Sequence, residues 1–238
     1  MQKVMMIDPK EEDYMYNEAI KTFRTNMQFV GKNIKSILLT SCVTGEGKSD
    51  LTFELAKGLG NIGKKVLLLD ADIRGSAFIT RYQVEQSTFG LSQYLSGQVE
   101  LEDICYQTNF PNMDIIFAGS YGVNSSDLLE EEAFEELMKT MRERYDYIIV
   151  DTPPIGTLID AAIIAEHCDG AVMVIESEET SYKSAQKAKK QLEQTNCKLL
   201  GCVLNKVDLK KDKYYGSYGY GYHYYGHSRE QEMKENEK

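Results

Sequence analysis

The run SILLTSCVTGEGKSDLTFELAKGL, residues 36–59, joins an apolar segment, a glycine-rich turn and a helix-like segment. It opens with an apolar run typical of a buried strand and closes with leucines and alanines at the spacing of a helix. The glycine-rich turn TGEGKS, residues 44–49, stands between the two. A turn in that place lets backbone N–H groups and the start of a helix point together at an anion. The run therefore predicts a strand, a phosphate-binding loop and a helix in succession.

The residue types in this turn suit a nucleoside triphosphate. Gly45 and Gly47 let the backbone approach the phosphates. Lys48 is expected to reach the β- and γ-phosphates, and the Ser49 hydroxyl is expected to bind Mg²⁺. The match to G-x-x-x-x-G-K-[ST] is incomplete, because Cys42 stands where the pattern has its first glycine. A glycine-rich turn that binds no nucleotide is the alternative.

Apolar runs and helix-like segments alternate along the rest of the chain. The strand-like runs lie at 36–41, 65–72, 113–119, 147–151, 170–176 and 199–205, and the helix-like segments at 49–59, 128–144, 160–167 and 181–194. Near-continuous apolar strands are typical of a parallel sheet that helices cover on both faces. We therefore predict an α/β fold with a doubly wound, mostly parallel sheet.

A further helix is predicted before the first strand, over residues 16–30, because apolar and charged residues separate there into two stripes. The apolar stripe is formed by Ala19, Ile20, Phe23 and Met27.

Two of the strand-like runs end in carboxylates. The run VLLLDADIR, residues 66–74, places Asp70 and Asp72 two residues apart, so both point the same way from the end of a strand. The run YIIVDTPP, residues 147–154, ends with Asp151 before a turn that two prolines stiffen. Ligands of open α/β sheets bind at the carboxyl ends of the strands, where Asp151 is suited to hold Mg²⁺ through a water. Solvated strand-end aspartates are the alternative.

The C-terminal segment YYGSYGYGYHYY, residues 214–225, holds seven of the sixteen tyrosines of the chain. Glycine and tyrosine alternate there without the aliphatic residues that a packed strand or helix buries. We expect a domain over 1–209 and a mobile, exposed tail over 210–238. A phosphate site and this tail on one chain suggest a kinase that is its own substrate. The predicted phosphorylation sites are Tyr214, Tyr215, Tyr218, Tyr220, Tyr222, Tyr224 and Tyr225.

Composition excludes several classes of protein. The net charge of −10 argues against a protein that wraps nucleic acid. Five scattered cysteines without C-x-x-C pairs indicate neither a disulfide framework nor a zinc site, and a reducing cytosol fits them best. No apolar run approaches the length of a transmembrane helix, about 20 residues.

Together these motifs resemble the bacterial tyrosine kinases, in particular the separate cytoplasmic kinase subunits of Gram-positive capsule and exopolysaccharide systems. The resemblance covers nearly the whole chain and rests on GEGKS (45–49), LLLDADIR (67–74), IIVDTPP (148–154) and the terminal tyrosine cluster. It implies a P-loop NTPase fold that uses ATP and Mg²⁺ to phosphorylate protein tyrosine. The nucleotide site would comprise Thr44, Gly45, Glu46, Gly47, Lys48, Ser49, Asp50 and Asn205.

The resemblance also implies catalytic roles. Asp70 would orient or deprotonate the incoming tyrosine hydroxyl, and the division of roles between Asp70 and Asp72 stays open. Asp72 and Asp151 would hold the water shell of Mg²⁺, with Ser49 on the metal directly. Lys48 and Arg74 would offset charge on the transferring phosphoryl group.

The predicted N-terminal helix carries Glu18-x-x-Lys21-x-x-Arg24, which looks like the family's E-x-x-R-x-x-R motif for assembling a ring of subunits, of which an octamer is one form. Lys21 replaces the first arginine and lacks its planar fork, so a weaker ring contact is expected. Asp50 stands where the family often has threonine, and its carboxylate would repel the α-phosphate unless it turned away.

Partners follow from the resemblance as well. It implies a membrane adaptor of the polysaccharide co-polymerase type, protein tyrosine substrates and a cognate phosphotyrosine phosphatase. The expected location is the cytoplasm, with recruitment to the inner face of the plasma membrane, and the expected role is regulation of capsular or exopolysaccharide synthesis and export.

Three alternatives remain. A partitioning or cell-division-site ATPase has the same kind of loop, usually with an extra lysine in K-G-G-x-G-K-[ST]. A GTPase is suggested by Asn205-Lys206-Val207-Asp208, which mimics N-K-x-D, although Asp151-Thr-Pro-Pro is not the D-x-x-G expected there. A non-catalytic interaction protein with a degenerate nucleotide site is the third.

Overall fold

The structure is a computed structural model, and it describes residues 2–10, 13–31, 33–86, 88–120 and 125–208. The seven tail tyrosines lie outside these residues, so the prediction for the tail stays a prediction. Within the part of the chain that the structure describes, no helix has both the length and the apolar character needed to cross a bilayer.

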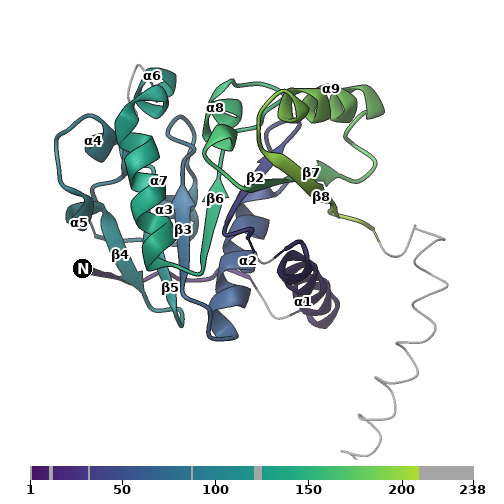
Figure 1. The fold of residues 1–238 in the computed structure, drawn as a ribbon. Helices are drawn as coiled ribbons and strands as arrows, with labels where there is room; N and C mark the ends of the chain where they lie inside the picture. The colour runs from purple at the N-terminus through teal and green to yellow at the C-terminus, as the bar shows by residue number, and fades with distance from the viewer. Residues whose placement is uncertain (1, 11–12, 32, 87, 121–124, 209–238) are drawn as a thin grey trace, which may run out of the picture.

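The centre of the protein is one eight-stranded sheet in the order β1-β4-β5-β3-β6-β2-β7-β8 (Figure 1). Neighbouring strands run parallel except β4 and β5, which are antiparallel. The strands are β1 (Gln2–Val4), β2 (Ser36–Ser41), β3 (Val66–Asp70), β4 (Cys105–Thr108), β5 (Met113–Ile116), β6 (Tyr147–Asp151), β7 (Gly170–Glu176) and β8 (Lys198–Asn205). The mostly parallel sheet predicted from the apolar runs is confirmed, and each of the six runs overlaps a strand.

Helices cover both faces of the sheet, as the doubly wound prediction requires. They are α1 (Tyr14–Phe29), α2 (Lys48–Asn61), α3 (Phe78–Arg81), α4 (Leu91–Leu95), α5 (Leu101–Ile104), α6 (Ser125–Glu130), α7 (Glu132–Arg144), α8 (Asp160–Glu166) and α9 (Tyr182–Glu193). Because side chains of a strand alternate between faces, Leu67 and Leu69 of β3 belong to one buried cluster and Val66 and Leu68 to another.

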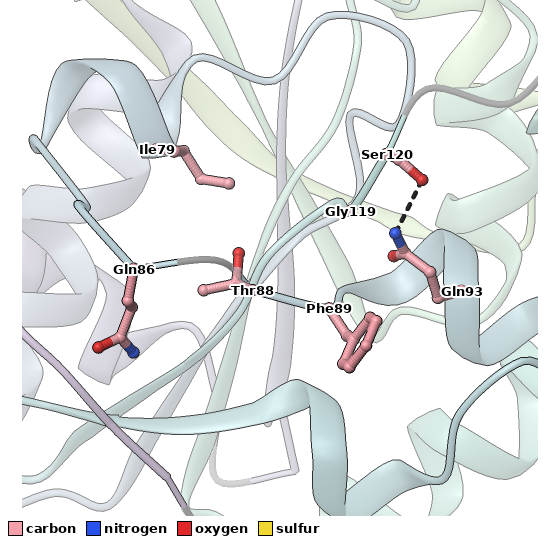
Figure 2. A pocket seen from close by; sticks show the side chains of 7 residues that line it. All are labelled: Ile79, Gln86, Thr88, Phe89, Gln93, Gly119 and Ser120. Carbon is pink, nitrogen blue, oxygen red and sulfur yellow. Dashed lines mark hydrogen bonds between the residues drawn. The ribbon is translucent and has the colours of Figure 1, made fainter.

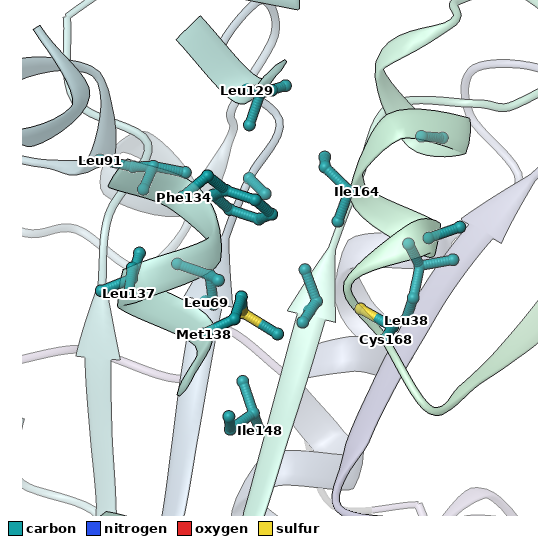
Figure 3. Close-up of a cluster of buried hydrophobic side chains, with 14 of the residues drawn as sticks. Leu38, Leu69, Leu91, Leu129, Phe134, Leu137, Met138, Ile148, Ile164 and Cys168 are labelled. Carbon is teal, nitrogen blue, oxygen red and sulfur yellow. The ribbon is translucent and has the colours of Figure 1, made fainter. Parts of the chain in front are cut away.

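Helices α7, α8 and α9 pack on the first of these clusters. Figure 3 shows Phe134 and Met138 of α7 and Ile164 of α8 beside Leu69 and Ile148 of the sheet. The opposite face is covered by α1, α2 and α3, whose buried side chains join the second cluster. The strands between the two layers are therefore apolar on both sides, which explains their near-continuous hydrophobic sequence.

Helix α1 begins where Asp13 caps it, because the Asp13 carboxylate accepts the backbone N–H of Tyr16 at 2.9 Å. Ile20, Phe23 and Met27 are buried, which confirms the predicted amphipathic helix. Ala19 is exposed instead of lying in the apolar stripe.

Two features of the architecture differ from the prediction. Residues 128–144 form parts of two helices, because the extended backbone of Glu131 (φ −68°, ψ 149°) ends α6 and starts α7. The strands β1 and β4 and the short helices α3, α4 and α5 were not predicted. Each spans only three to five residues, too few for periodicity to show.

Candidate active site

The loop predicted to bind phosphate joins β2 to α2, and α2 starts at Lys48. Gly45 (φ 94°) and Gly47 (φ 83°) adopt left-handed backbone that favours glycine. A Cβ atom on Gly47 would also lie 2.2 Å from the amide nitrogen of Asn205, so a side chain at this position would displace Asn205. The loop thus has the geometry that brings backbone N–H groups and a helix N-terminus to one point.

The side chain of Glu46 binds the backbone of this loop. Its side chain is buried, and its carboxylate accepts the backbone N–H of Cys42 at 2.5 Å and of Val43 at 2.9 Å. The hydroxyl of Thr180 donates to the second carboxylate oxygen. Its side chain thus fixes the shape of the loop, and the predicted contact of Glu46 with the nucleotide stays a prediction.

Several side chains of the site contact the carboxylate of Asp151 at the end of β6. Lys48 Nζ lies 3.0 Å from both carboxylate oxygens, and the Ser49 hydroxyl donates to one of them at 2.7 Å. The Thr52 hydroxyl lies 3.0 Å from the other oxygen. The structure therefore brings together the three predicted residues Lys48, Ser49 and Asp151 and adds Thr52, which faces them because it lies one turn beyond Lys48 on α2.

Asp70 lies beside Asp151, since the two residues are register partners in the adjacent strands β3 and β6. Its carboxylate is fully buried and accepts the hydroxyl of Ser76 and the backbone N–H of Ala118, the latter at 3.3 Å. Burial, followed by the negative charge of Asp151, raises the pKa of Asp70 to about 8. A carboxyl group with this pKa is a stronger base than an ordinary aspartate.

Asp72 lies at the rim of the same site. Its carboxylate accepts the backbone N–H of Gly75 at 3.0 Å and lies 3.9 Å from Lys48 Nζ. Burial raises the pKa of Asp72, and the Lys48 ammonium opposes that rise. The Lys48 ammonium thus interacts with the carboxylates of both Asp72 and Asp151.

Arg74 is held by two residues that sequence reasoning missed. Its Nε donates to the buried carboxylate of Asp160 at 2.7 Å, and its Nη2 donates to the Ser126 hydroxyl at 2.7 Å. These contacts tie the segment after β3 to α6 and α8. No sequence signal marks Asp160 or Ser126 as partners, because both are distant in the chain.

Asp50, the residue at which phosphate repulsion was expected, turns away from the loop. One of its oxygens lies 2.5 Å from Nη2 of Arg81 on α3. The other oxygen is buried and has no hydrogen-bond partner among the described residues. The Asp50 carboxylate is therefore paired with Arg81, and its effect on nucleotide binding stays a prediction.

The end of β8 lies against the phosphate loop. Asn205 donates its amide N–H to the backbone carbonyl of Glu46 at 2.9 Å, and Lys206 Nζ donates to the carbonyl of Gly45 at 2.7 Å. The structure thus places Asn205 at the nucleotide loop. Thr44 is exposed in that loop.

The three residues predicted for ring assembly lie on α1. Lys21 and Glu18 pair with each other at 2.7 Å in exposed positions. Arg24 Nη1 lies 3.5 Å from the carbonyl of Gly58 on α2. A role of these residues in assembly stays a prediction.

The donor set fits a hard cation. Ser49, Asp72 and Asp151 offer oxygen atoms, which Mg²⁺ prefers. Among the described residues, no group of three or more His, Cys, Asp or Glu side chains is placed to hold a metal alone. Mg²⁺ in nucleotide sites usually binds through one or two carboxylates, with phosphates and waters completing its shell.

The chain is similar in sequence to known proteins. The family model described as AAA domain matches residues 34–200. The chain is 39% identical over 222 residues to the tyrosine-protein kinase CpsD of Streptococcus agalactiae, which covers 92% of this chain and 97% of the relative.

Two solved structures share the fold. The kinase domain of Escherichia coli tyrosine kinase ETK matches with a TM-score of 0.77 and 28% identity, over 80% of this chain and 75% of that one. The septum site-determining protein MinD of Pyrococcus horikoshii, solved with Mg-ADP, matches with a TM-score of 0.64 and 26% identity, over 73% and 71%. The chain belongs to the AAA domain family, and within the proteins of this fold it is a member of the bacterial tyrosine-protein kinase family.

Proposed function

We propose that this protein transfers the γ-phosphoryl group of ATP to tyrosine hydroxyls of its own C-terminal cluster, with one subunit acting on the tail of another. The observation that carries the proposal is the convergence of Lys48, Ser49 and Asp70 on Asp151 beside the phosphate loop. The acceptors would be the seven tyrosines of residues 214–225.

The residues of the site account for each part of the transfer. The loop N–H groups and Lys48 would hold the phosphates, and Ser49, Asp72 and Asp151 would hold Mg²⁺. Bound Mg²⁺ neutralises charge on the phosphates. Arg74 would stabilise the charge of the transferring group from its position between Asp160 and Ser126.

Asp70 would act as the base. The free tyrosine hydroxyl has a pKa near about 10, so the attack benefits from a group that takes its proton. The tyrosine oxygen forms a bond to the γ-phosphorus, the bond from that phosphorus to the β–γ bridging oxygen breaks, and ADP leaves. The proton of the hydroxyl passes to the carboxylate of Asp70. The buried position of Asp70 beside Asp151 raises its pKa to about 8, so the carboxylate form that accepts the proton becomes abundant near and above that pH.

Regulation follows the same family pattern. We place residues 1–209 in the kinase domain and 210–238 in the acceptor tail, with Glu18, Lys21 and Arg24 at the contacts of a ring. The protein would sit in the cytoplasm at the inner face of the membrane, bound to an adaptor, and a phosphatase would reverse its phosphorylation. Its role would be control of capsular or exopolysaccharide synthesis, as the resemblance to the bacterial tyrosine kinases implies.

A switch ATPase of the MinD type is a second candidate, since that protein shares the fold. The extra lysine of the K-G-G-x-G-K-[ST] pattern would fall on Val43, so the feature that would favour this candidate is missing.

The proposal is tested by incubating the purified chain with ATP and Mg²⁺ and mapping phosphosites. We expect phosphotyrosine in residues 214–225 of the wild type and none in Lys48→Met. ATP hydrolysis without phosphotyrosine would favour the switch ATPase.

A further inference from the structure

We propose that three lysines on α9 bind the C-terminal segment 214–225 of the same chain once its tyrosines are phosphorylated. These residues, Lys183, Lys187 and Lys190, form the lysine stripe. The inference rests on the proposed kinase function and adds to it the surface that holds the modified tail. A phosphorylated segment is strongly anionic, so the surface that binds it must offer positive charge.

Helix α9 is basic on a chain that is acidic overall. The chain has 37 Asp and Glu residues against 27 Lys and Arg, whereas residues 180–192 contain four lysines and no Asp or Glu. The fourth of these lysines, Lys189, pairs with Glu193. Among the described residues, no carboxylate pairs with the ammonium groups of the lysine stripe. Three positive charges are therefore available to a partner.

The three lysines lie on one face of the helix. Positions 183, 187 and 190 follow the i, i+4, i+7 spacing that aligns side chains along a helix. All three are exposed, and the opposite face of α9 packs on the sheet through the buried residues Ala188 and Leu192. The lysine stripe is thus carried by a packed helix and open to solvent.

The start of α9 and the end of β8 lie close together. The Thr180 hydroxyl, just before the helix, donates to the Glu46 carboxylate, and the Asn205 amide at the end of β8 donates to the Glu46 carbonyl at 2.9 Å. The backbone N–H of Ser177 donates to the carbonyl of Asn205 at 2.9 Å. Figure 1 shows α9 at the β7 and β8 side of the sheet, and the described chain ends just after β8, at Asp208. The tail therefore begins near the first turn of α9.

The tail is long enough to lie along the lysine stripe of its own copy. Six residues lead from Asp208 to Tyr214. An extended chain spans about 3.3 Å per residue, so the tyrosine segment can begin up to about 20 Å from Asp208. Lys183 and Lys190 are about 10 Å apart along the helix axis, at about 1.5 Å per residue. Binding within one copy therefore needs no second subunit.

The spacing of the tyrosines suits that of the lysines. Tyr218, Tyr220 and Tyr222 alternate with glycine. In an extended chain, residues two apart point to the same side and lie about 6.6 Å from each other. Lys183 and Lys187 are about 6 Å apart along the helix axis. Successive phosphates can therefore meet successive lysines, each in a charge-assisted hydrogen bond.

Other places on the described chain suit phosphate less well. The cavity of about 420 Å³ that Phe89 and Gly119 line has no charged side chain among its described lining residues (Figure 2). Lys206 lies at the end of β8, but its ammonium group pairs with Glu176 at 2.9 Å. The lysine stripe differs from both because it offers several cations without such partners.

Phosphorylation decides whether the segment binds. Residues 214–225 contain no Asp, Glu, Lys or Arg, so the unmodified segment offers the lysine stripe no opposite charge. Each phosphate adds about −1.5 to −2 charges. Exposed ion pairs are individually weak, but a segment tethered to the same chain is present at an effective concentration in the millimolar range. Weak contacts are therefore enough to hold the modified tail.

The test measures peptide binding by fluorescence anisotropy at an ionic strength of about 0.1 M. The protein is the full chain with its seven tail tyrosines replaced by phenylalanine, which leaves the lysine stripe unoccupied. The probe is a fluorescein-labelled peptide of residues 214–225 with phosphate on Tyr218, Tyr220 and Tyr222. We expect the phosphopeptide to bind and the unmodified peptide to show no binding. Lys183→Gln/Lys187→Gln/Lys190→Gln should weaken binding about tenfold, because three exposed ion pairs are lost.

The matched control is Lys3→Gln/Lys65→Gln/Lys139→Gln, which removes three exposed lysines outside α9. It changes the net charge equally and should alter the affinity by no more than about twofold, since charges farther away than the Debye length are screened. Equal affinity of the parent chain and the α9 variant for the phosphopeptide would overturn the inference. Equal losses in the α9 variant and the control would also overturn it.

Capture by the chain's own tail is checked with the wild type. A wild-type chain whose tail carries phosphotyrosine should bind the phosphopeptide severalfold more weakly than the same chain after phosphatase treatment, because its own tail competes. Equal affinity of the two forms would overturn capture within one copy. Sedimentation with phosphatidylglycerol vesicles tests another anionic partner. Vesicle binding that needs the lysine stripe, by a chain that does not bind the phosphopeptide, would assign this surface to a membrane and overturn the inference.

The synthetic phosphopeptide separates this inference from the proposed function. A chain that binds the phosphopeptide through the lysine stripe but forms no phosphotyrosine with ATP and Mg²⁺ would contradict the kinase function and keep the lysine stripe. A chain that phosphorylates its tail but does not bind the phosphopeptide would do the reverse.

Discussion

The Asp50 carboxylate, two residues into α2, lies 2.5 Å from the Arg81 guanidinium on α3. This ion pair couples the helix that carries Lys48 and Ser49 to the segment that follows Asp70. It also turns the one acidic side chain of the first turn of α2 away from the phosphate loop.

Arg81→Ala should therefore weaken ATP binding. Without the guanidinium, the Asp50 charge is free to act on the phosphates that bind at the start of the same helix. We expect the KM for ATP to rise about three- to tenfold, which corresponds to about 0.7–1.4 kcal/mol. Steady-state kinetics at varied ATP measures the effect.

The double variant Arg81→Ala/Asp50→Asn is the control for that experiment. Removing the carboxylate should restore the KM for ATP close to that of the wild type. A KM that stays high in the double variant would show that Arg81 acts in some other way.

Thr52→Val should lower kcat about tenfold with little change in the KM for ATP. The Thr52 hydroxyl lies 3.0 Å from Asp151, and its loss leaves the carboxylate less firmly oriented. Valine has nearly the same shape at this fully buried position, so the fold should hold. Thr52→Ser keeps the hydroxyl and should retain most of the activity; equal losses in the two variants would argue against the orienting role.

Asp70→Asn should stabilise the protein in the absence of nucleotide and Mg²⁺, and more so at high pH. Burial raises the pKa of Asp70 to about 8, whereas in the unfolded chain it titrates near about 4. Between these values the unfolded chain binds fewer protons than the folded one, so folding stability falls as pH rises through this window. Asparagine does not titrate, so it does not make the folding stability fall as pH rises through this window.

Calorimetry in EDTA at pH 5 and pH 8 checks this prediction. The melting temperature of Asp70→Asn should exceed that of the wild type by about 4 °C or more at pH 8. The difference should be smaller at pH 5. An equal difference at both pH values would show that Asp70 does not titrate in this window.

Residues that carry a local pattern could be predicted from the sequence. Asp70 and Asp151 end apolar runs, and parallel strands bring such ends to one edge. Lys48 and Ser49 follow a glycine-rich turn of the kind that is typical of a phosphate-binding loop.

The residues that the sequence did not reveal act through contacts between distant segments. Asp160 holds Arg74 across 86 residues, and Arg81 reaches Asp50 from a helix of only four residues. Glu46 was predicted as part of the nucleotide site, and the bond from its side chain to the loop backbone could not be predicted from the motif. Such pairings depend on tertiary packing, which periodicity does not encode.

In the proposed function, one subunit phosphorylates the tyrosine tail of another. The direct measurement mixes a full chain that carries Lys48→Met with a second full chain whose seven tail tyrosines are replaced by phenylalanine, in ATP and Mg²⁺. Neither chain alone should yield phosphotyrosine in residues 214–225, and the mixture should place it on the tail of the Lys48→Met chain. A mixture in which that tail stays unmodified, while the wild type modifies its own, would contradict phosphorylation between subunits.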